Sequence, residues 1–417
     1  MRVLTLFGDD HHPFIYLLAG LPDMSPTHTW KRMRETLGVQ PGRGIHASAD
    51  DAAGLHPLAP TRVRKVKIIH FSPWAGHLQN GTEFVESLPQ MDLRTRVNDP
   101  SDKALCVKAR LDCDWHGEHV RAFNAMRSET IEFFPVEVVG VAGVLDVLGQ
   151  PRSPHEEWWF VITGQHPQKL GSAAGRLLAA YSRFGIRTLY YAFDEASRTM
   201  PCFKDIAPHL SVLIHDESPL DPSACELLRP DATLIHRSWV ANCVPYEAPF
   251  NEAPDERILF LGSQLGLTEH RLRQIEFLKE RFKDRFIAIH DHSLPVAERS
   301  RLNRYKVSLC PEGRKFTTPG MSATHTDRPF WSGCLGMVPV SEDSRYGGRL
   351  EELERAGLIR RYSHGDLKSL AEACERALAA TPVERRRIYD HFNRCESIGA
   401  VVADAIGAGE DRQRAVA

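Results

Sequence analysis

A polar stretch near residue 320 carries the side chains best suited to hold a phosphorylated ligand. It lies between VSLCPEG and CLGMVPV, two short apolar runs bounded by Gly and Pro, which are typical of strands buried on both faces of a parallel sheet. Ligands of open α/β sheets bind beyond the carboxyl ends of the strands, so this stretch is expected to face a site. The candidate binding residues are Glu312, Arg314, Lys315, His325, Thr326 and Arg328.

Each of these side chains has a chemical use and a simpler alternative. Arg328 can grip phosphate with two parallel hydrogen bonds just before a helix expected to begin near Pro329, or it can be an ordinary surface arginine. Thr326 can donate its hydroxyl to phosphate or cap the helix. Glu312 could bind sugar or ribose hydroxyls, and Arg314 and Lys315 could bind a diphosphate. The alternative is a surface cluster in which the opposite charges of these three residues neutralise one another. His325 either donates a hydrogen bond to phosphate or only packs against neighbouring side chains.

A second phosphate-facing turn is expected at Gly262 and Ser263. The glycines of GSQLG follow a predicted strand and precede a predicted helix, where a backbone can approach a phosphate closely. The spacing is GxxxG, which is not the dinucleotide fingerprint and lacks the lysine of a P-loop. A plain tight turn is the alternative.

A dense polar cluster near the start of the chain suits proton transfer. Asp9, Asp10, His11 and His12 follow the apolar segment 2–7, and carboxylates and imidazoles are the usual general bases. Two Asp and two His would also suit a divalent metal ion, and a capped turn is the structural alternative.

Apolar segments alternating with helical ones predict a mainly parallel α/β architecture. The helix predicted over 269–281 has Leu272, Ile275 and Leu278 on one face, and the stretch 382–406 is predicted to be strongly helical. Three prolines within PYEAPFNEAPD, residues 245–255, indicate a linker. The predicted strands cover 2–7, 66–71, 104–113, 130–139, 158–163, 188–193, 212–215 and 233–235 before the linker. After it they cover 257–261, 286–290, 358–362 and the apolar runs at 307–313 and 334–340.

Length and composition favour two domains in a reducing compartment. A chain of 417 residues exceeds the size of one core, so we expect a domain over 1–250, with an inserted hairpin region at about 60–130, and another over 251–417. Nine scattered cysteines without a CxxC pair indicate reduced thiols and a cytoplasmic location. The chain shows no signal-peptide pattern and no apolar run long enough for a membrane span. Its net charge of −2 gives no overall attraction to nucleic acid or anionic lipid.

The order CPEG, a polar loop, RPFW and then GCLGMVPV resembles the donor-binding half of glycosyltransferases with two Rossmann-like domains, the GT-B fold. It is nearest to the exostosin-like branch and to the group 1 glycosyltransferases. About forty residues carry the likeness. Trp331 departs from it, because those families place an acid there that is assigned to the ribose or sugar of the donor.

The resemblance implies two doubly wound domains facing across a cleft and transfer of a sugar from a nucleotide diphosphate sugar, such as a UDP-sugar, to an acceptor hydroxyl. The second domain would hold the donor, and the first would hold the acceptor together with a base among Asp10, His11 and His12. It implies no cofactor and no metal ion, and the missing acid at Trp331 slightly favours inversion. The resemblance does not identify the acceptor, which could be a glycan, a lipid-linked sugar, a protein or modified DNA. The alternatives are a sugar-nucleotide epimerase on the same scaffold and a catalytically degenerate module that binds nucleotide sugar or glycan.

Overall fold

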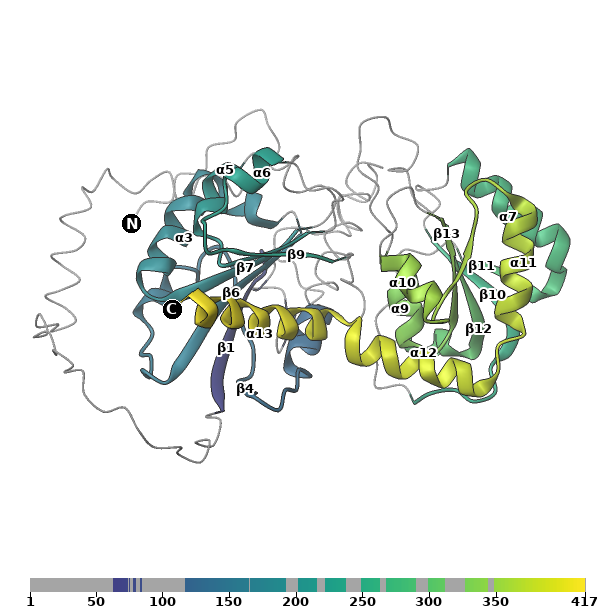
Figure 1. Cartoon of the computed structure of the whole chain (residues 1–417), viewed down its shortest axis with the longest axis horizontal. Coiled ribbons are helices and arrows are strands. Elements are labelled where there is room, and N and C mark those ends of the chain that lie inside the picture. The colour runs from purple at the N-terminus through teal and green to yellow at the C-terminus, as the bar shows by residue number, and fades with distance from the viewer. Residues whose placement is uncertain are drawn as a thin grey trace, which may run out of the picture.

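The computed structural model contains two parallel sheets flanked by helices (Figure 1). Each sheet with its helices is an α/β unit consistent with a Rossmann-like domain, as the alternation of segments predicts. The predicted strands at 2–7 and 104–113 lie outside the described residues. The structure describes residues 63–73, 75, 78–79, 83–84, 117–164, 166–192, 202–215, 222–237, 249–262, 268–289, 299–311, 327–343 and 349–416.

The first sheet is parallel throughout and has the strand order β4-β1-β6-β7-β8-β9. β4 and β5 pair with successive parts of the same edge of β1, so the predicted strand over 130–139 is interrupted. The strands are β1 (Arg64–Phe71), β4 (Ile131–Phe133), β5 (Glu137–Val139), β6 (Glu156–Thr163), β7 (Ile186–Tyr191), β8 (Val212–His215) and β9 (Thr233–His236). The chain reverses its direction across the sheet between β1 and β6, which makes their carboxyl ends a switch point.

The stretch predicted as an insertion contributes to the sheet itself. β1 lies within it and is a central strand, because it pairs with β6 on one side and with β4 and β5 on the other. A two-stranded antiparallel pair, β2 (Leu78–Gln79) with β3 (Glu83–Phe84), follows it, and residues 85–116 lie outside the described range.

Helices cover both faces of the first sheet. Alternate strand residues point to opposite faces, so Ile69, Phe160 and Ile162 pack with α3 on one side, while Ile68 and Trp159 pack on the other. Segment 117–124 and the C-terminal helix contribute to that second core. The short helices of this unit are η2 (Asp146–Gly149), η3 (His166–Ala173), α3 (Ala174–Arg183), α5 (Phe203–Ile206), η4 (Ala207–His209) and α6 (Pro222–Glu226).

The second sheet is also parallel, with the order β11-β10-β12-β13-β14. Its strands are β10 (Asp255–Leu261), β11 (Phe286–Ile289), β12 (Tyr305–Cys310), β13 (Val338–Glu342) and β14 (Arg360–Tyr362). Its helices are α7 (Glu269–Phe282), η5 (Lys283–Arg285), η6 (Ser300–Arg304), α9 (Arg328–Cys334), α10 (Arg349–Arg355) and α11 (Leu367–Leu378). In chain order this is 2-1-3-4-5, so the switch point lies between the carboxyl ends of β10 and β12.

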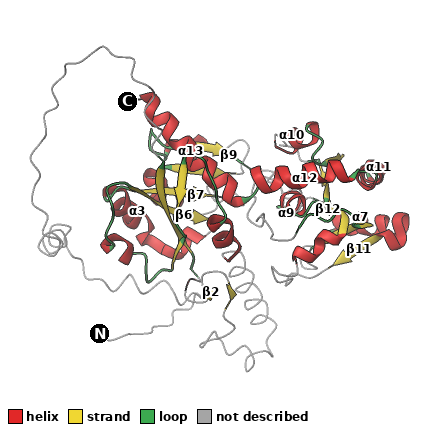
Figure 2. Cartoon of the chain, turned by 90° about the horizontal axis from the view of Figure 1, so that it is seen from below, coloured by secondary structure: helices red, strands yellow, loops and turns green. Residues whose placement is uncertain are grey.

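The stretch 382–406, predicted to be helical, forms parts of two helices. α12 (Pro382–Cys395) packs against α9 of the second unit, and α13 (Ile398–Val416) packs against β8 and β9 of the first. Figures 1 and 2 show the chain crossing back from the second sheet to the first in these two helices. The last helix therefore lies with the first sheet, although the sequence placed it in the domain over 251–417. No helix among the described residues has the length and apolar character needed to cross a membrane.

A buried carboxylate marks the break between α12 and α13. Glu396 is fully buried and forms ion pairs with Arg349 of α10 and with Arg237, which follows β9 of the first sheet, at 3.7 Å. His391 Nε2 lies 3.4 Å from the same carboxylate oxygen. The junction of the two units is therefore held by charge as well as by apolar packing.

Lowering the pH is expected to weaken this junction through His391. Burial, and then the charges of the nearby arginines, lower the pKa of His391 below its usual value. His391 therefore becomes protonated near pH 6.5 in the unfolded chain but only at lower pH in the folded chain. As a result, the free energy of unfolding falls as the pH drops through about 6.5. Urea unfolding at pH 7.5 and 5.5 measures this change. The free energy of unfolding should fall less between the two pH values in His391→Asn than in the parent chain. The arginines are Arg349, Arg394, Arg237 and Arg387.

The exposed His155 supplies the control for that measurement, because His155→Asn should leave the loss between the two pH values unchanged. An equal loss in His391→Asn and the parent chain would contradict the assignment.

Close packing of α9 on α12 requires a glycine. A Cβ at Gly333 would lie 2.6 Å from two ring carbons of Phe392, which is fully buried. We expect Gly333→Ala to lower the free energy of unfolding by about 1 to 3 kcal/mol, because overpacking outweighs the gain in helix propensity. Chemical denaturation measures the change. Gly407→Ala is the matched control, since Gly407 lies in α13 with nothing within 4 Å of the added carbon, and it should be neutral or slightly stabilising.

Candidate functional site

Arg328 lies at the switch point of the second sheet. It begins α9, and its Nε donates to the carbonyl oxygen of Leu261, the last residue of β10, at 3.0 Å. Ser332 Oγ donates to the carbonyl oxygen of Arg328 at 2.6 Å and fixes the start of the helix. Within the described part of the chain, neither terminal nitrogen of the guanidinium has a hydrogen-bond partner. Arg328 is thus anchored through Nε while two donor groups stay available beside the end of β10.

Gly262 leaves space for the Phe260 ring and the Arg328 guanidinium because it has no side chain. A Cβ there would lie 2.6 Å from the Phe260 ring and 3.4 Å from a terminal nitrogen of Arg328, so a side chain would displace the residues that shape the site. Its amide donates to the carbonyl oxygen of Ile289 at 3.1 Å, which ties the end of β10 to the end of β11. The sequence placed Gly262 and Arg328 at one site, and the structure brings them together.

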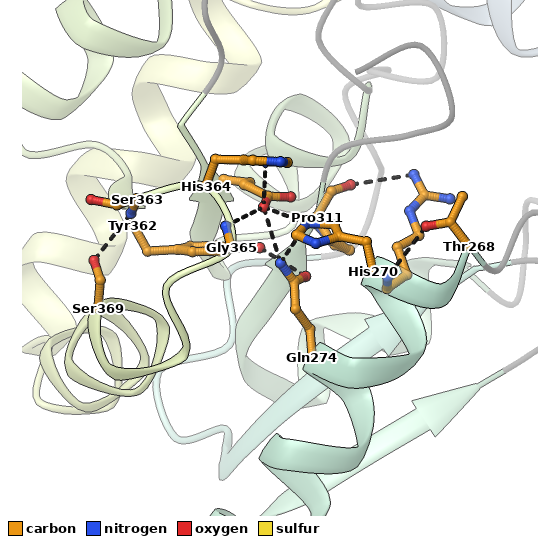
Figure 3. A network of polar contacts seen from close by, with 11 residues as sticks. Thr268, His270, Gln274, Pro311, Tyr362, Ser363, His364, Gly365 and Ser369 are labelled. Carbon is orange, nitrogen blue, oxygen red and sulfur yellow. Dashed lines mark hydrogen bonds and ion pairs between the residues drawn. The ribbon is translucent and has the colours of Figure 1, made fainter. Parts of the chain in front are cut away.

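A second group of polar side chains gathers around Glu342, at the carboxyl end of β13 (Figure 3). Its Oε1 lies 2.6 Å from His270 Nε2, 2.9 Å from His364 Nδ1 and 3.0 Å from Gln274 Nε2. The amide of Gly365 also donates to this oxygen, at 3.3 Å. The two imidazole rings are stacked with centroids 4.6 Å apart. Glu342 is fully buried, whereas both histidines are partly exposed, so the group opens toward solvent on the imidazole side.

The N-terminal turn of α7 connects this group to the neighbouring strands. Thr268 caps α7 by accepting from the amide of Arg271, and a guanidinium nitrogen of Arg271 donates to the carbonyl oxygen of Pro311, just after β12, at 3.3 Å. Tyr362, at the end of β14, donates its hydroxyl to Gln274 Oε1 at 3.1 Å. Figure 3 shows these side chains converging from α7 and from the ends of the strands.

The carboxyl ends of β1 and β6 hold a buried polar cluster in the first unit. His70 of β1 and His119 of segment 117–124 meet edge to face with centroids 5.6 Å apart, and His119 Nδ1 lies 3.3 Å from Thr163 Oγ1. Glu118 is fully buried and forms an ion pair with Arg299 of the second unit at 2.8 Å. This cluster thus combines imidazoles at the switch point of the first sheet with a charged contact between the units.

Most of the predicted site residues lie outside the described part of the chain. Arg328 and Gly262 are the two that the structure describes. Trp331, which stands in place of an acid in the resembled families, is nearly buried within the hydrophobic core. Those outside the described residues are Asp10, His11, His12, Ser263, Glu312, Arg314, Lys315, His325 and Thr326.

Sequence reasoning missed the group around Glu342 because it treated α7 as an ordinary amphipathic helix. Leu272, expected on the buried face, is 41% exposed, while Arg271 and Gln274 are buried beside Ile275 and Leu278. The available signal was the i, i+4 pair of His270 and Gln274 on one helix, together with polar residues directly after two predicted strands.

No family model matches the chain, and no curated protein matches it. Similar solved structures include AviGT4, a glycosyltransferase involved in avilamycin A biosynthesis, with 12% identity, coverage of 66% of this chain and 89% of that chain, and a TM-score of 0.37. The spinosyn rhamnosyltransferase SpnG complexed with thymidine diphosphate has 11% identity, 83% and 100% coverage, and a TM-score of 0.32. The lipopolysaccharide outer core galactosyltransferase WaaB has 10% identity, 82% and 99% coverage, and a TM-score of 0.34. These values are too low to transfer a fold family or an activity to this chain.

Proposed function

We propose that the chain is a glycosyltransferase of the GT-B arrangement, which transfers a sugar from a nucleotide diphosphate sugar to an acceptor hydroxyl. The observation that carries the proposal is Arg328, anchored at the switch point of the second sheet with two terminal nitrogens that have no hydrogen-bond partner among the described residues. A guanidinium in that place can hold a phosphate with two parallel hydrogen bonds. The exostosin-like likeness of RPFW and GCLGMVPV adds to this proposal.

The reaction places two chemical demands on the site. A bond forms between the acceptor oxygen and the anomeric carbon, the bond from that carbon to the diphosphate oxygen breaks, and the diphosphate leaves with the electron pair. The charge that develops on the diphosphate needs fixed donors. We assign this role to Arg328 with Arg314, Lys315, His325, Thr326 and the backbone at Gly262 and Ser263, and we assign Glu312 to hydroxyls of the donor.

The first unit would hold the acceptor and remove its proton. We assign the base to Asp10, His11 or His12, which are of the residue types that accept protons near neutral pH. The polar ends of β1 and β6 support a ligand-facing role for this unit. The ion pair between Glu118 and Arg299 supports a fixed approach of the two units at that edge.

The transfer itself is proposed to need no metal ion, since basic side chains neutralise the leaving group, and inversion is the proposed stereochemistry. Adding Mg²⁺ is therefore expected to leave turnover unchanged. The proposed location is the cytoplasm, where the six described cysteines, all free thiols, would remain reduced.

The deciding experiment screens nucleotide sugars against the purified chain by thermal shift and then follows the best binder by chromatography. A ligand present at 100 times its Kd should stabilise the fold by about 2.7 kcal/mol. Slow release of nucleoside diphosphate and free sugar in water, with faster release of the diphosphate and formation of a glycosylated product when an acceptor is added, supports transfer. An epimerised nucleotide sugar would indicate the epimerase alternative, and binding without any turnover would indicate the degenerate binding module.

A further inference from the structure

Three ligand atoms from three separate elements converge around the end of β13. His270 Nε2 comes from the first turn of α7, Glu342 Oε1 from the end of β13 and His364 Nδ1 from the turn after β14. All three atoms lie within 4.8 Å of one another. Two imidazole nitrogens and one carboxylate oxygen form a ligand set that suits zinc and related transition metals.

The contacts of this group are not explained by hydrogen bonds alone. His270 Nε2, Glu342 Oε1 and Gln274 Nε2 form a closed triangle with sides of 2.6, 3.0 and 3.0 Å. If His270 Nε2 carries a proton, it donates to Glu342 but faces another donor on Gln274. If it carries none, it accepts from Gln274 but faces an acceptor oxygen at 2.6 Å. One side of the triangle is therefore unfavourable in either protonation state.

The carboxylate oxygen is also surrounded by more donors than it can satisfy. Glu342 Oε1 lies within 3.3 Å of His270, His364, Gln274 and the amide of Gly365. One carboxylate oxygen offers about two lone pairs. A cation that took both imidazole nitrogens and this oxygen as ligands would replace the two imidazole contacts with one metal bond and reduce the partners of the oxygen from four to three. Gln274 and Gly365 would remain as its hydrogen-bond donors, which is the outer-shell support that metal-bound carboxylates usually have.

We propose that His270, Glu342 and His364 bind one zinc ion. Tetrahedral bonds of 2.0 to 2.1 Å set ligand atoms about 3.3 Å apart. From their distances of 2.6 and 2.9 Å, His270 Nε2 would therefore move away from the carboxylate oxygen by about 0.7 Å and His364 Nδ1 by about 0.4 Å. The partly exposed side of His364 leaves the fourth position for water or an oxygen of a ligand. Mg²⁺ is a poor fit because it prefers oxygen ligands.

The zinc site is distinct from the proposed phosphate position. Arg328 contacts the end of β10, whereas Glu342 ends β13, and β12 lies between those strands. Two strand spacings separate them, about 10 Å. The ion would join the start of α7, the end of β13 and the turn after β14 at the carboxyl edge of the sheet. It takes no part in the transfer step proposed above.

The test is zinc binding to the full chain after chelation and buffer exchange, measured by competition with a chromophoric zinc chelator. We expect about one Zn²⁺ per chain, no binding of Mg²⁺ at the same concentration, and a zinc-dependent rise in melting temperature. His364→Ala should weaken binding at least about tenfold and abolish the rise. Because His364 is partly exposed, this variant should fold, and its melting temperature without zinc should be near that of the parent chain.

The exposed His155 again supplies the control, and His155→Ala should bind zinc normally. Arg328→Ala should also bind zinc normally, so failure of the zinc proposal and failure of the transferase proposal are separable. Absence of zinc binding in the parent chain would overturn the proposal, as would equal binding by His364→Ala and the parent chain.

Discussion

Replacing Arg328 with alanine should weaken the binding of a nucleoside diphosphate by about 10- to 150-fold, or about 1.5 to 3 kcal/mol. That range is the contribution of a charge-assisted pair of hydrogen bonds to phosphate. The fold should survive, because Arg328 forms one side-chain hydrogen bond to protein within the described residues, to the carbonyl of Leu261. Calorimetric titration of both chains with the same diphosphate measures the difference.

Two further variants make this test specific. Arg355→Ala removes an exposed arginine of α10 and should leave the affinity unchanged. Arg328→Lys keeps the charge but loses the planar fork, so it should recover only part of the affinity. Parent-like affinity in Arg328→Ala would remove Arg328 from the site and, with it, the main support for the proposed function.

Local patterns were sufficient to predict most of the sheets. Buried parallel strands are short, continuous apolar runs, and β8, predicted over 212–215, has those bounds in the structure. Local patterns also predicted the helical stretch 382–406, but they gave no sign of the break between its two helices at Glu396. The break is stabilised by Arg237 and Arg349, which lie far from it in the sequence, and no local pattern contains that information.

The candidate site likewise has a part that the sequence predicts and a part that only the folded structure shows. The position of Arg328 was predictable because the residue that begins a crossover helix lies at the edge of the sheet where the preceding strand ends. The group around Glu342 was not, because its members become neighbours only when α7 packs beside β13 and β14. His270 and Gln274 have the spacing of one helix face, but only the folded sheet shows that this face meets a buried carboxylate.

The largest loss of activity is expected at the proposed base. Asp10→Asn or His11→Ala should lower kcat by about a hundredfold or more, because proton removal by a positioned base typically contributes that much to the rate. The affinity for nucleoside diphosphate should stay nearly constant, since the base interacts with the acceptor and acts in the transition state. Steady-state kinetics with a saturating donor, combined with calorimetric titration of the diphosphate, separates the two quantities.

The buried imidazole of His119 provides a competing location for the base, and His119→Gln decides between the two. His119 lies beside Thr163 at the switch point of the first sheet, where a strand-end group would meet an acceptor. If the base is in the turn at 9–12, His119→Gln should change kcat much less than Asp10→Asn does. If kcat instead falls a hundredfold in His119→Gln, while Asp10→Asn and His11→Ala stay near the parent value, then the proton is removed at the ends of β1 and β6. The exposed His155 sets the baseline, because His155→Gln should change neither kcat nor affinity.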